Sequence, residues 1–287
     1  MSRIDKAFKK ENAFLKENAF LKESTFLKDS TFLKEKAFIA FLTGGDPNIE
    51  TTEKLIYAME EAGADLIEIG IPFSDPIAEG VVIQDANERA LKSGCTTDSL
   101  FELVRKVRER SEVPLVFLTY LNPIYTYGKE KFLEKCKMVG VDGIIVPDLP
   151  YEEKEELLPE CERNDVTLIS LIAPTSKDRI KMIAKEAKGF IYLVSSLGVT
   201  GVRSNITTDV DSMIEEVRKV TTIPCAIGFG ISTTNQASEF AKKADGVIVG
   251  SQIVRIIESY SENCIPKVYE YVRKMKDAIS DTNQMEK

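Results

Sequence analysis

The chain has 287 residues, 43% of them hydrophobic, which is enough for one large α/β domain or two small ones. Its formal net charge of -8 argues against binding to a nucleic-acid backbone, although a helix N-terminus could still bind one small phosphate. The sequence contains no histidine, which excludes Ser-His-Asp and Cys-His catalysis and His-bound metals. Proton transfer is therefore left to Asp, Glu, Lys, Tyr or Cys.

The compartment is indicated by the cysteines and by the lack of long apolar runs. Five scattered cysteines form no C-x-x-C pair, which indicates a reducing environment rather than a metal site or a disulfide framework. No apolar run approaches the roughly 18 residues of a membrane span. The N-terminus lacks the apolar core of a secretory signal. We expect a soluble cytoplasmic protein with no membrane or nucleic-acid partner.

Residues 7–36 consist of five tandem hexads, AFKKEN, AFLKEN, AFLKES, TFLKDS and TFLKEK. A step of six residues turns a helix by about 240°, so the repeated Phe residues spread over three faces and form no apolar stripe. We expect residues 1–36 to be an N-terminal extension, helical or disordered, that carries no chemistry. Two interpretations stay open: a duplication tolerated at a terminus, or an arm that binds a partner or a second copy.

From Phe38 onward, short apolar runs alternate with charged stretches of helical composition, among them 52–62, 98–110, 129–139 and 209–220. Eight such runs with helices between them predict a (β/α)8 barrel, also called a TIM barrel. An open doubly wound sheet is the alternative, but no G-x-G-x-x-G follows the first run. We expect the barrel to span residues 37–280, before a tail at 281–287. The predicted strands are 38–42, 65–69, 114–119, 143–146, 167–172, 190–194, 224–229 and 246–249.

Glu68 is a carboxylic acid in the middle of the second apolar run, LIEIG. A buried carboxylate must find partners or take a raised pKa, and a raised pKa suits a group that gives and takes a proton near neutral pH. A purely structural pairing inside the barrel is the other interpretation. Strand ends carry the active site of this fold, so Glu68 is a candidate catalytic residue.

Three glycine-rich turns follow the last three predicted strands, at 198–201 (GVTG), 228–230 (GFG) and 250–251 (GS). Glycine lets backbone N–H groups approach a phosphate closely, and these loops are the usual phosphate site of a (β/α)8 barrel. The turns therefore favour a phosphorylated substrate. Because no P-loop lysine motif is present, we do not expect a nucleoside triphosphate.

The segment 66–80, LIEIGIPFSDPIAEG, strongly resembles the signature of the tryptophan synthase alpha subunit family. The resemblance continues in IQ at 83–84, FLTGGDP at 41–47, YLNP at 120–123, GVTG at 198–201 and GFGIS at 228–232, and it spans residues 36 to 275. It implies a lyase of tryptophan biosynthesis that splits indole-3-glycerol phosphate into indole and glyceraldehyde 3-phosphate.

The resemblance also implies roles for two acids. Glu68 would protonate the indole carbon that bears the side chain and help to remove the neighbouring hydroxyl proton. Glu79 matches the family's second carboxylate, which binds the indole N–H. Two departures occur here: Glu79 stands where Asp is common, and Val81 stands where Pro is common. Both put the rate and the order of this loop in question, but not the class of reaction.

Further positions are carried over from the family. Thr200 would contact Glu68 when its loop closes over the substrate. Asp75 and Asn122 would face a β subunit in an α2β2 heterotetramer. That partner, not this chain, would hold pyridoxal phosphate, and we expect this chain to use neither cofactor nor metal. The expected substrate-binding residues are Phe41, Leu118, Tyr192 and Phe229 around the indole, and Gly201, Gly230, Gly250 and Ser251 around the phosphate.

Two other functions are compatible with a barrel of this kind. An aldolase with a Schiff-base lysine would need a lysine inside a strand, and none of the eight runs has one in its interior. A catalytically weak subunit that mainly activates its β partner is the second alternative. Indole release from indole-3-glycerol phosphate, measured alone and with a β subunit, separates these functions.

Overall fold

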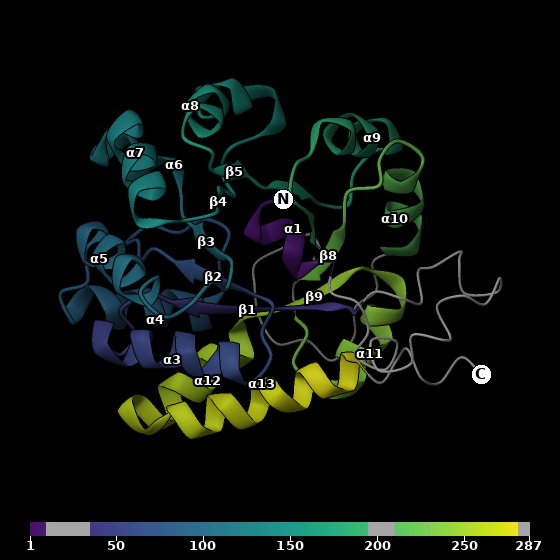
Figure 1. The fold of residues 1–287 in the computed structure, drawn as a ribbon. Helices are drawn as coiled ribbons and strands as arrows, with labels where there is room; N and C mark the ends of the chain where they lie inside the picture. Colours follow the sequence, from purple (N-terminus) through teal and green to yellow (C-terminus); the bar gives the residue numbers. More distant parts are fainter. Residues whose placement is uncertain (10–34, 195–209, 229, 281–287) are drawn as a thin grey trace.

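The computed structural model describes residues 1–9, 35–194, 210–228 and 230–280. Within these ranges nine parallel strands form one nearly closed sheet that is surrounded by helices, which confirms the predicted barrel (Figure 1). The sheet order is β5-β4-β3-β2-β1-β9-β8-β7-β6. The strands are β1 (Ala37–Thr43), β2 (Leu66–Gly70), β3 (Leu115–Leu118), β4 (Gly143–Ile145), β5 (Thr167–Leu168), β6 (Ser170–Ile172), β7 (Ile191–Val194), β8 (Cys225–Gly228) and β9 (Gly246–Val249).

Apart from the helix before the first strand and those after the last, the helices lie between successive strands in the chain. Most helices cover the outer face of the sheet. In the described ranges no helix is both long enough and apolar enough to cross a membrane. The α-helices are α1 (Arg3–Ala7), α3 (Ile49–Glu61), α4 (Val81–Lys92), α5 (Thr97–Val107), α6 (Leu121–Tyr127), α7 (Lys129–Val139), α8 (Leu158–Arg163), α9 (Lys177–Glu186), α10 (Val210–Arg218), α11 (Thr234–Lys243), α12 (Ser251–Tyr260) and α13 (Ile265–Ser280), and the 3-10 helices are η4 (Tyr151–Glu156) and η5 (Ser261–Asn263).

The predicted fifth strand is divided at Ile169 into β5 and β6, which pair with different neighbours. β5 pairs with β4, and the Ile169 N–H still donates to the Ile144 carbonyl at 2.9 Å. After that point β6 pairs with β7 alone. The barrel therefore closes through one strand that changes partner half-way, which explains nine segments where eight runs were predicted.

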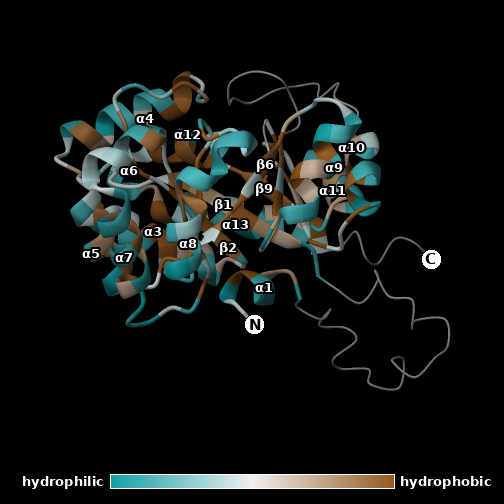
Figure 2. Cartoon of the chain, turned by 90° about the horizontal axis from the view of Figure 1, so that it is seen from above, coloured by the Kyte–Doolittle hydropathy of each residue, from teal (hydrophilic) through white to brown (hydrophobic). Residues whose placement is uncertain are grey.

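Successive side chains along each strand point alternately outward to the helices and inward to the barrel, and so form separate outer and inner hydrophobic cores. In β1, Phe38, Ala40 and Leu42 pack outward against the helices, while Ile39 and Phe41 point into the barrel. Figure 2 shows the same division, with hydrophobic strands at the centre and hydrophilic residues over the outer helices. A side chain two residues after an inward-facing one also faces inward, and this rule places the candidate acid on β2.

Helix α1 closes the N-terminal end of the barrel. Its Ile4, together with Phe8 just beyond its end, is buried in the inner core, and the Phe8 ring packs 5.4 Å from that of Phe190. Arg3 pairs with Asp142 at 3.2 Å. Residues 2–8, predicted to be part of the N-terminal extension, thus pack against the barrel. Residues 10–34, which include most of the hexads, lie outside the described part of the chain.

An ion pair ties the loop after β1 to α4 and α12. Asp46, only 1% exposed, accepts two hydrogen bonds from the Arg89 guanidinium, each 2.9 Å long. Arg89 also reaches Glu258 on α12, at 3.1 Å. Bidentate pairing of this kind fixes direction as well as distance, so α4 is held against the C-terminal end of the barrel.

Candidate active site

Glu68 lies in the middle of β2 and points into the barrel. It is in register with Phe41 on β1 and Val116 on β3, and Leu66 two residues earlier belongs to the inner core. The Glu68 side chain is 1% exposed, and neither carboxyl oxygen has a hydrogen-bond partner in the described part of the chain. Burial raises the pKa of Glu68 to about 8. A carboxyl group with this pKa is mostly protonated at neutral pH.

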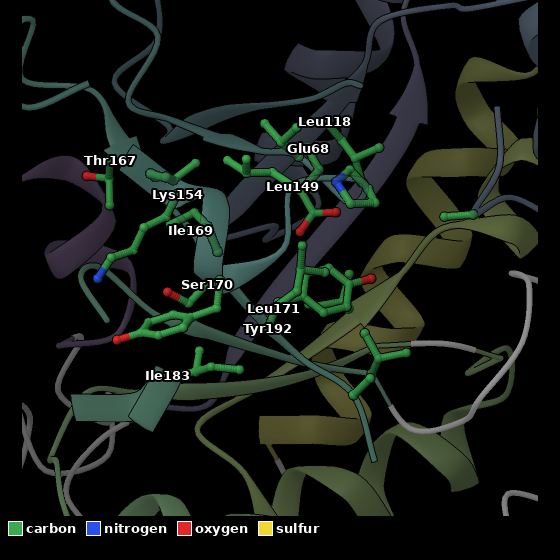
Figure 3. Close-up of a pocket in the computed structure, with 18 of the residues that line it drawn as sticks. Glu68, Leu118, Leu149, Lys154, Thr167, Ile169, Ser170, Leu171, Ile183 and Tyr192 are labelled. Carbon is green, nitrogen blue, oxygen red and sulfur yellow. The ribbon is translucent and has the colours of Figure 1, made fainter. Parts of the chain in front are cut away.

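Tyr192, from β7 across the barrel, faces Glu68 (Figure 3). Burial, and secondly the charge of Glu68, raise the pKa of Tyr192 well above its usual value. The ring lies directly against the backbone of Gly228: a methyl group built there would be 2.4 Å from the tyrosine oxygen. Gly228 thus leaves room for an aromatic ring beside the buried acid.

Glu79 reaches the same space from the loop between β2 and α4. Its side chain is 7% exposed, and Asn87 Nδ2 donates a 2.7 Å hydrogen bond to its Oε2. The Tyr120 hydroxyl is close enough to the same carboxyl group to affect its pKa. Burial raises the pKa of Glu79 to about 7, while the bonds from Asn87 and Tyr120 pull it down. Near neutral pH Glu79 is thus partly ionised, while Glu68 carries its proton.

A cavity of about 1070 Å³ joins the two acids. Figure 3 shows Glu68, Leu118 and Tyr192 directed into it. It continues past β5 and β6 toward the space between α8 and α9, where Lys154 and Ile183 also line it. An apolar cavity with a few convergent polar groups is the usual form of a small-molecule site. Of the predicted indole-binding residues, Phe41, Leu118 and Tyr192 line this cavity, and Phe229 lies outside the described residues.

The predicted phosphate-binding residues fall partly on this cavity. Gly230, Gly250 and Ser251 line it, and Ser251 is the first residue of α12. Among the described residues no side chain caps that helix at its start, and N–H groups at a helix N-terminus can bind an anion. Thr200 and Gly201 lie outside the described residues.

The two predicted interface residues lie away from Glu68. Asp75 accepts a hydrogen bond from the hydroxyl of its neighbour Ser74. Asn122 lies in the first turn of α6 and lines a separate small hollow that also includes Phe73. Neither Asp75 nor Asn122 lines the large cavity. Close to Asp75 in the chain, the Ile77 side chain is 73% exposed, so this edge presents apolar surface to solvent.

Sequence reasoning did not assign Asn87 and Tyr120, the two partners of Glu79. Tyr120 lies two residues after the end of β3, a position that could have marked it, because strand ends carry the site in this fold. Asn87 has no such signal. It lies eight residues after Glu79, on a helix, and only the way the loop folds back shows that the two side chains meet.

Residues 27–280 match the family model described as tryptophan synthase alpha chain. The chain belongs to that family. It is 47% identical over 243 residues to the tryptophan synthase alpha chain of Thermoanaerobacter sp. (strain X514), covering 84% of this chain and 93% of the relative. It is 49% identical over 243 residues to that of Lactiplantibacillus plantarum, covering 84% and 92%.

Solved structures agree with the assignment to the tryptophan synthase alpha chain family. The alpha subunit from Legionella pneumophila str. Paris superposes with a TM-score of 0.81 at 32% identity, over 98% of this chain and 99% of that one. Mycobacterium tuberculosis tryptophan synthase gives a TM-score of 0.80 at 28% identity, over 97% and 98%. This family member therefore catalyses the alpha reaction of tryptophan synthase, a lyase step of tryptophan biosynthesis, and has a β subunit as its partner.

Proposed function

We propose that Glu68 is the acid and base, and Glu79 the charge-stabilising group, of a retro-aldol cleavage of indole-3-glycerol phosphate. The observation that supports these roles is the contrast between the two carboxyl groups in one cavity. In the described part of the chain Glu68 has no hydrogen-bond donor and a pKa near 8, whereas Glu79 accepts a hydrogen bond from Asn87 and has a pKa near 7. Two acids whose environments separate their pKa values are suited to opposite tasks.

The proton on Glu68 goes first to the indole carbon that bears the glycerol phosphate side chain. This carbon becomes tetrahedral, and positive charge develops on the ring nitrogen. The Glu79 carboxylate accepts a hydrogen bond from the ring N–H and stabilises that charge. Low dielectric inside the barrel strengthens this interaction.

The Glu68 carboxylate then takes the proton of the adjacent side-chain hydroxyl. As the C–O bond becomes a carbonyl, the bond between side chain and ring breaks, and its electron pair returns to the ring. The products are indole and glyceraldehyde 3-phosphate, and Glu68 ends protonated as it began. Both proton transfers thus use one carboxyl group, which is consistent with a pKa near the working pH.

The other residues are assigned to binding. Phe41, Leu118, Tyr192 and Phe229 would surround the indole, and Thr200 would contact Glu68 over the bound substrate. The N–H groups at the start of α12 support a phosphate site there. The proposed phosphate-binding residues are Gly201, Gly230, Gly250 and Ser251.

We also propose a β-subunit interface on this chain and a cytoplasmic location. Asp75 and Asn122 would lie at the β-subunit interface of an α2β2 heterotetramer, beside the exposed side chain of Ile77. Pyridoxal phosphate would be held by the β subunit and not by this chain. All five cysteines are buried and free, which suits a cytoplasmic protein.

The test is indole release from indole-3-glycerol phosphate by this chain, alone and with a β subunit. We expect low activity alone and strong activation by the β subunit. Gln can neither give a proton to the indole carbon nor accept one from the hydroxyl group. Glu68→Gln should therefore lower kcat at least about 1000-fold in the complex. If Glu68→Gln kept most of its activity, the mechanism would be wrong. If wild type released no indole yet activated the β subunit, the chain would be an activator only.

A further inference from the structure

Asn87 is a polar residue on the otherwise apolar inner face of α4. The buried residues of this helix are Ile83, Ala86, Asn87 and Ala90, and Asn87 is 4% exposed. A buried amide is costly unless it is hydrogen-bonded. The Asn87 amide donates to Glu79 Oε2 at 2.7 Å, a short bond between a neutral donor and an acidic acceptor.

The loop between β2 and α4 folds back along α4, so that the Glu79 side chain reaches the Asn87 amide. The helix begins at Val81, so Asn87 lies about 9 Å along its axis. The backbone of Glu79 is fixed to the same helix, because Gln84 Nε2 donates to its carbonyl oxygen at 2.7 Å. With that backbone fixed, an Asp at this position would end about one bond length, ~1.5 Å, short of the amide.

Tyr120 supplies a second contact to the Glu79 carboxyl group, with a defined direction. Its hydroxyl oxygen accepts the N–H of Ala78 at 3.1 Å, which leaves the hydroxyl proton to be donated. As a nearby donor, that hydroxyl lowers the pKa of Glu79. The Tyr120 ring packs 5.6 Å from that of Phe73, which holds it in place. Both donors thus favour the ionised form of Glu79.

We propose that Asn87 is the positioning residue for Glu79, whose side chain is just long enough to reach the Asn87 amide from its fixed backbone. Asn87 holds Oε2, and Tyr120 makes the other contact, so the carboxylate is fixed in the wall of the cavity. Asn87 touches no reacting atom. The inference rests on the proposed role of Glu79 and adds the residue that aims it.

The experiment compares Asn87→Leu, which keeps the volume and removes the donor, in the wild-type and Glu79→Asp backgrounds, each complexed with a β subunit. In the wild-type background we expect kcat to fall about 10-fold with little change in KM. The acid limb of the pH profile should move up by about one pH unit, because Glu79 loses a donor to its charged form. In the Glu79→Asp background the same substitution should change kcat less than about 2-fold.

Two further variants separate positioning from folding. Asn164 is also a buried asparagine, whose amide donates to the Glu160 carbonyl at 2.9 Å, so Asn164→Leu should lower stability without moving the pH profile. Asn87→Ser keeps a small donor and should fold if Asn87→Leu does not, with an acid limb that is shifted in the same direction.

The outcomes also distinguish this inference from the proposed function. If Glu79→Gln kept most of its activity, the role of Glu79 would fail, and the positioning role with it. If Glu79→Gln were inactive but neither Asn87 variant moved the acid limb, only the positioning role would fail. Equal losses of kcat from Asn87→Leu in both backgrounds would also overturn the positioning role. The effect of Asn87 would then not depend on the length of the side chain at position 79.

Discussion

Glu68 and Glu79 line the same cavity, but in the described part of the chain only Glu79 has hydrogen-bond donors on its carboxyl group. Burial raises the pKa of both acids, to about 8 for Glu68 and about 7 for Glu79. The difference between them comes from the donors, Asn87 and Tyr120, which favour the ionised form of Glu79. The carboxyl groups of Glu68 and Glu79, in the same cavity, therefore differ in their degree of ionisation near neutral pH.

The first prediction is a narrow, bell-shaped pH profile. Activity requires ionised Glu79 and protonated Glu68, so kcat/KM should rise as pH passes about 7 and fall as it passes about 8. The measurement is kcat/KM for indole release between pH 5.5 and 9.5, as set by the range of these pKa values. A flat profile up to pH 9.5 would show that protonated Glu68 is not needed.

The second prediction is that Glu68→Gln, which should lower kcat, makes the folded protein more stable at high pH. The folded-state pKa of Glu68, about 8, is above its ordinary value of 4.5, so protonation favours the folded state. This contribution is complete below pH 4.5 and is lost as pH rises through 8. Glu68→Gln should therefore unfold like wild type at pH 4.5 but be more stable at pH 9, by up to about 5 kcal/mol. Urea unfolding at both pH values tests this, and equal stability at pH 9 would contradict it.

Sequence patterns were sufficient to predict the barrel and the position of Glu68, because both follow from local alternation. In LIEIG, Leu66 and Glu68 must share a face, and the strand end then places the acid in the site. The interruption at Ile169 could not be predicted, because it depends on which neighbouring strand each half of 167–172 pairs with. The contact of Asn87 with Glu79 depends on a loop that folds back on itself, and no periodicity encodes that.

The third prediction uses Gly228 to displace Tyr192. A methyl group at Gly228 would lie 2.4–2.7 Å from three atoms of the Tyr192 ring and hydroxyl, which is too close for either to stay in place. Gly228→Ala should cost about 1–3 kcal/mol of stability and lower kcat about 100-fold, because the ring beside Glu68 must move.

A matched control for Gly228→Ala is available at the other end of the barrel. At Gly246, the first residue of β9, the nearest atoms to an added methyl group would belong to Ala37 and to the Phe8 ring, each 3.1 Å away or slightly more, and not to Tyr192. Gly246→Ala should lower the melting temperature with little change in kcat. If both variants lost activity equally, loss of packing, and not the position of Tyr192, would explain the result.

The fourth prediction concerns the ion pair between Arg89 and Asp46. Removing the guanidinium leaves the Asp46 carboxylate, 1% exposed, without its partner, so Arg89→Ala should cost about 3–5 kcal/mol. Lysine cannot form the bidentate pair, so Arg89→Lys should recover only part of this. The exposed Arg105, which pairs with Glu102, serves as the control, and Arg105→Ala should leave the free energy of unfolding nearly unchanged. Urea unfolding gives all three values, and similar losses at both arginines would contradict the prediction.

The fifth prediction is that residues 9–32 can be deleted. A methyl group built on Gly246 would lie 3.1 Å from both the Phe8 ring and the Ala37 carbonyl oxygen, so the two ends of the intervening segment adjoin. The deletion leaves residues 33–36, which reach about 13 Å, enough to join them.

Shortening this connection from 28 residues to four lowers the entropy cost of holding α1 in the barrel by about 1–2 kcal/mol. We therefore expect unchanged kcat with the β subunit and a slightly higher melting temperature. The control deletes residues 1–32 and so removes Ile4 and Phe8 as well, which should destabilise the barrel because its N-terminal end loses its cover. If deleting 9–32 instead abolished binding of the β subunit, the hexads would be a binding arm and not a tolerated duplication.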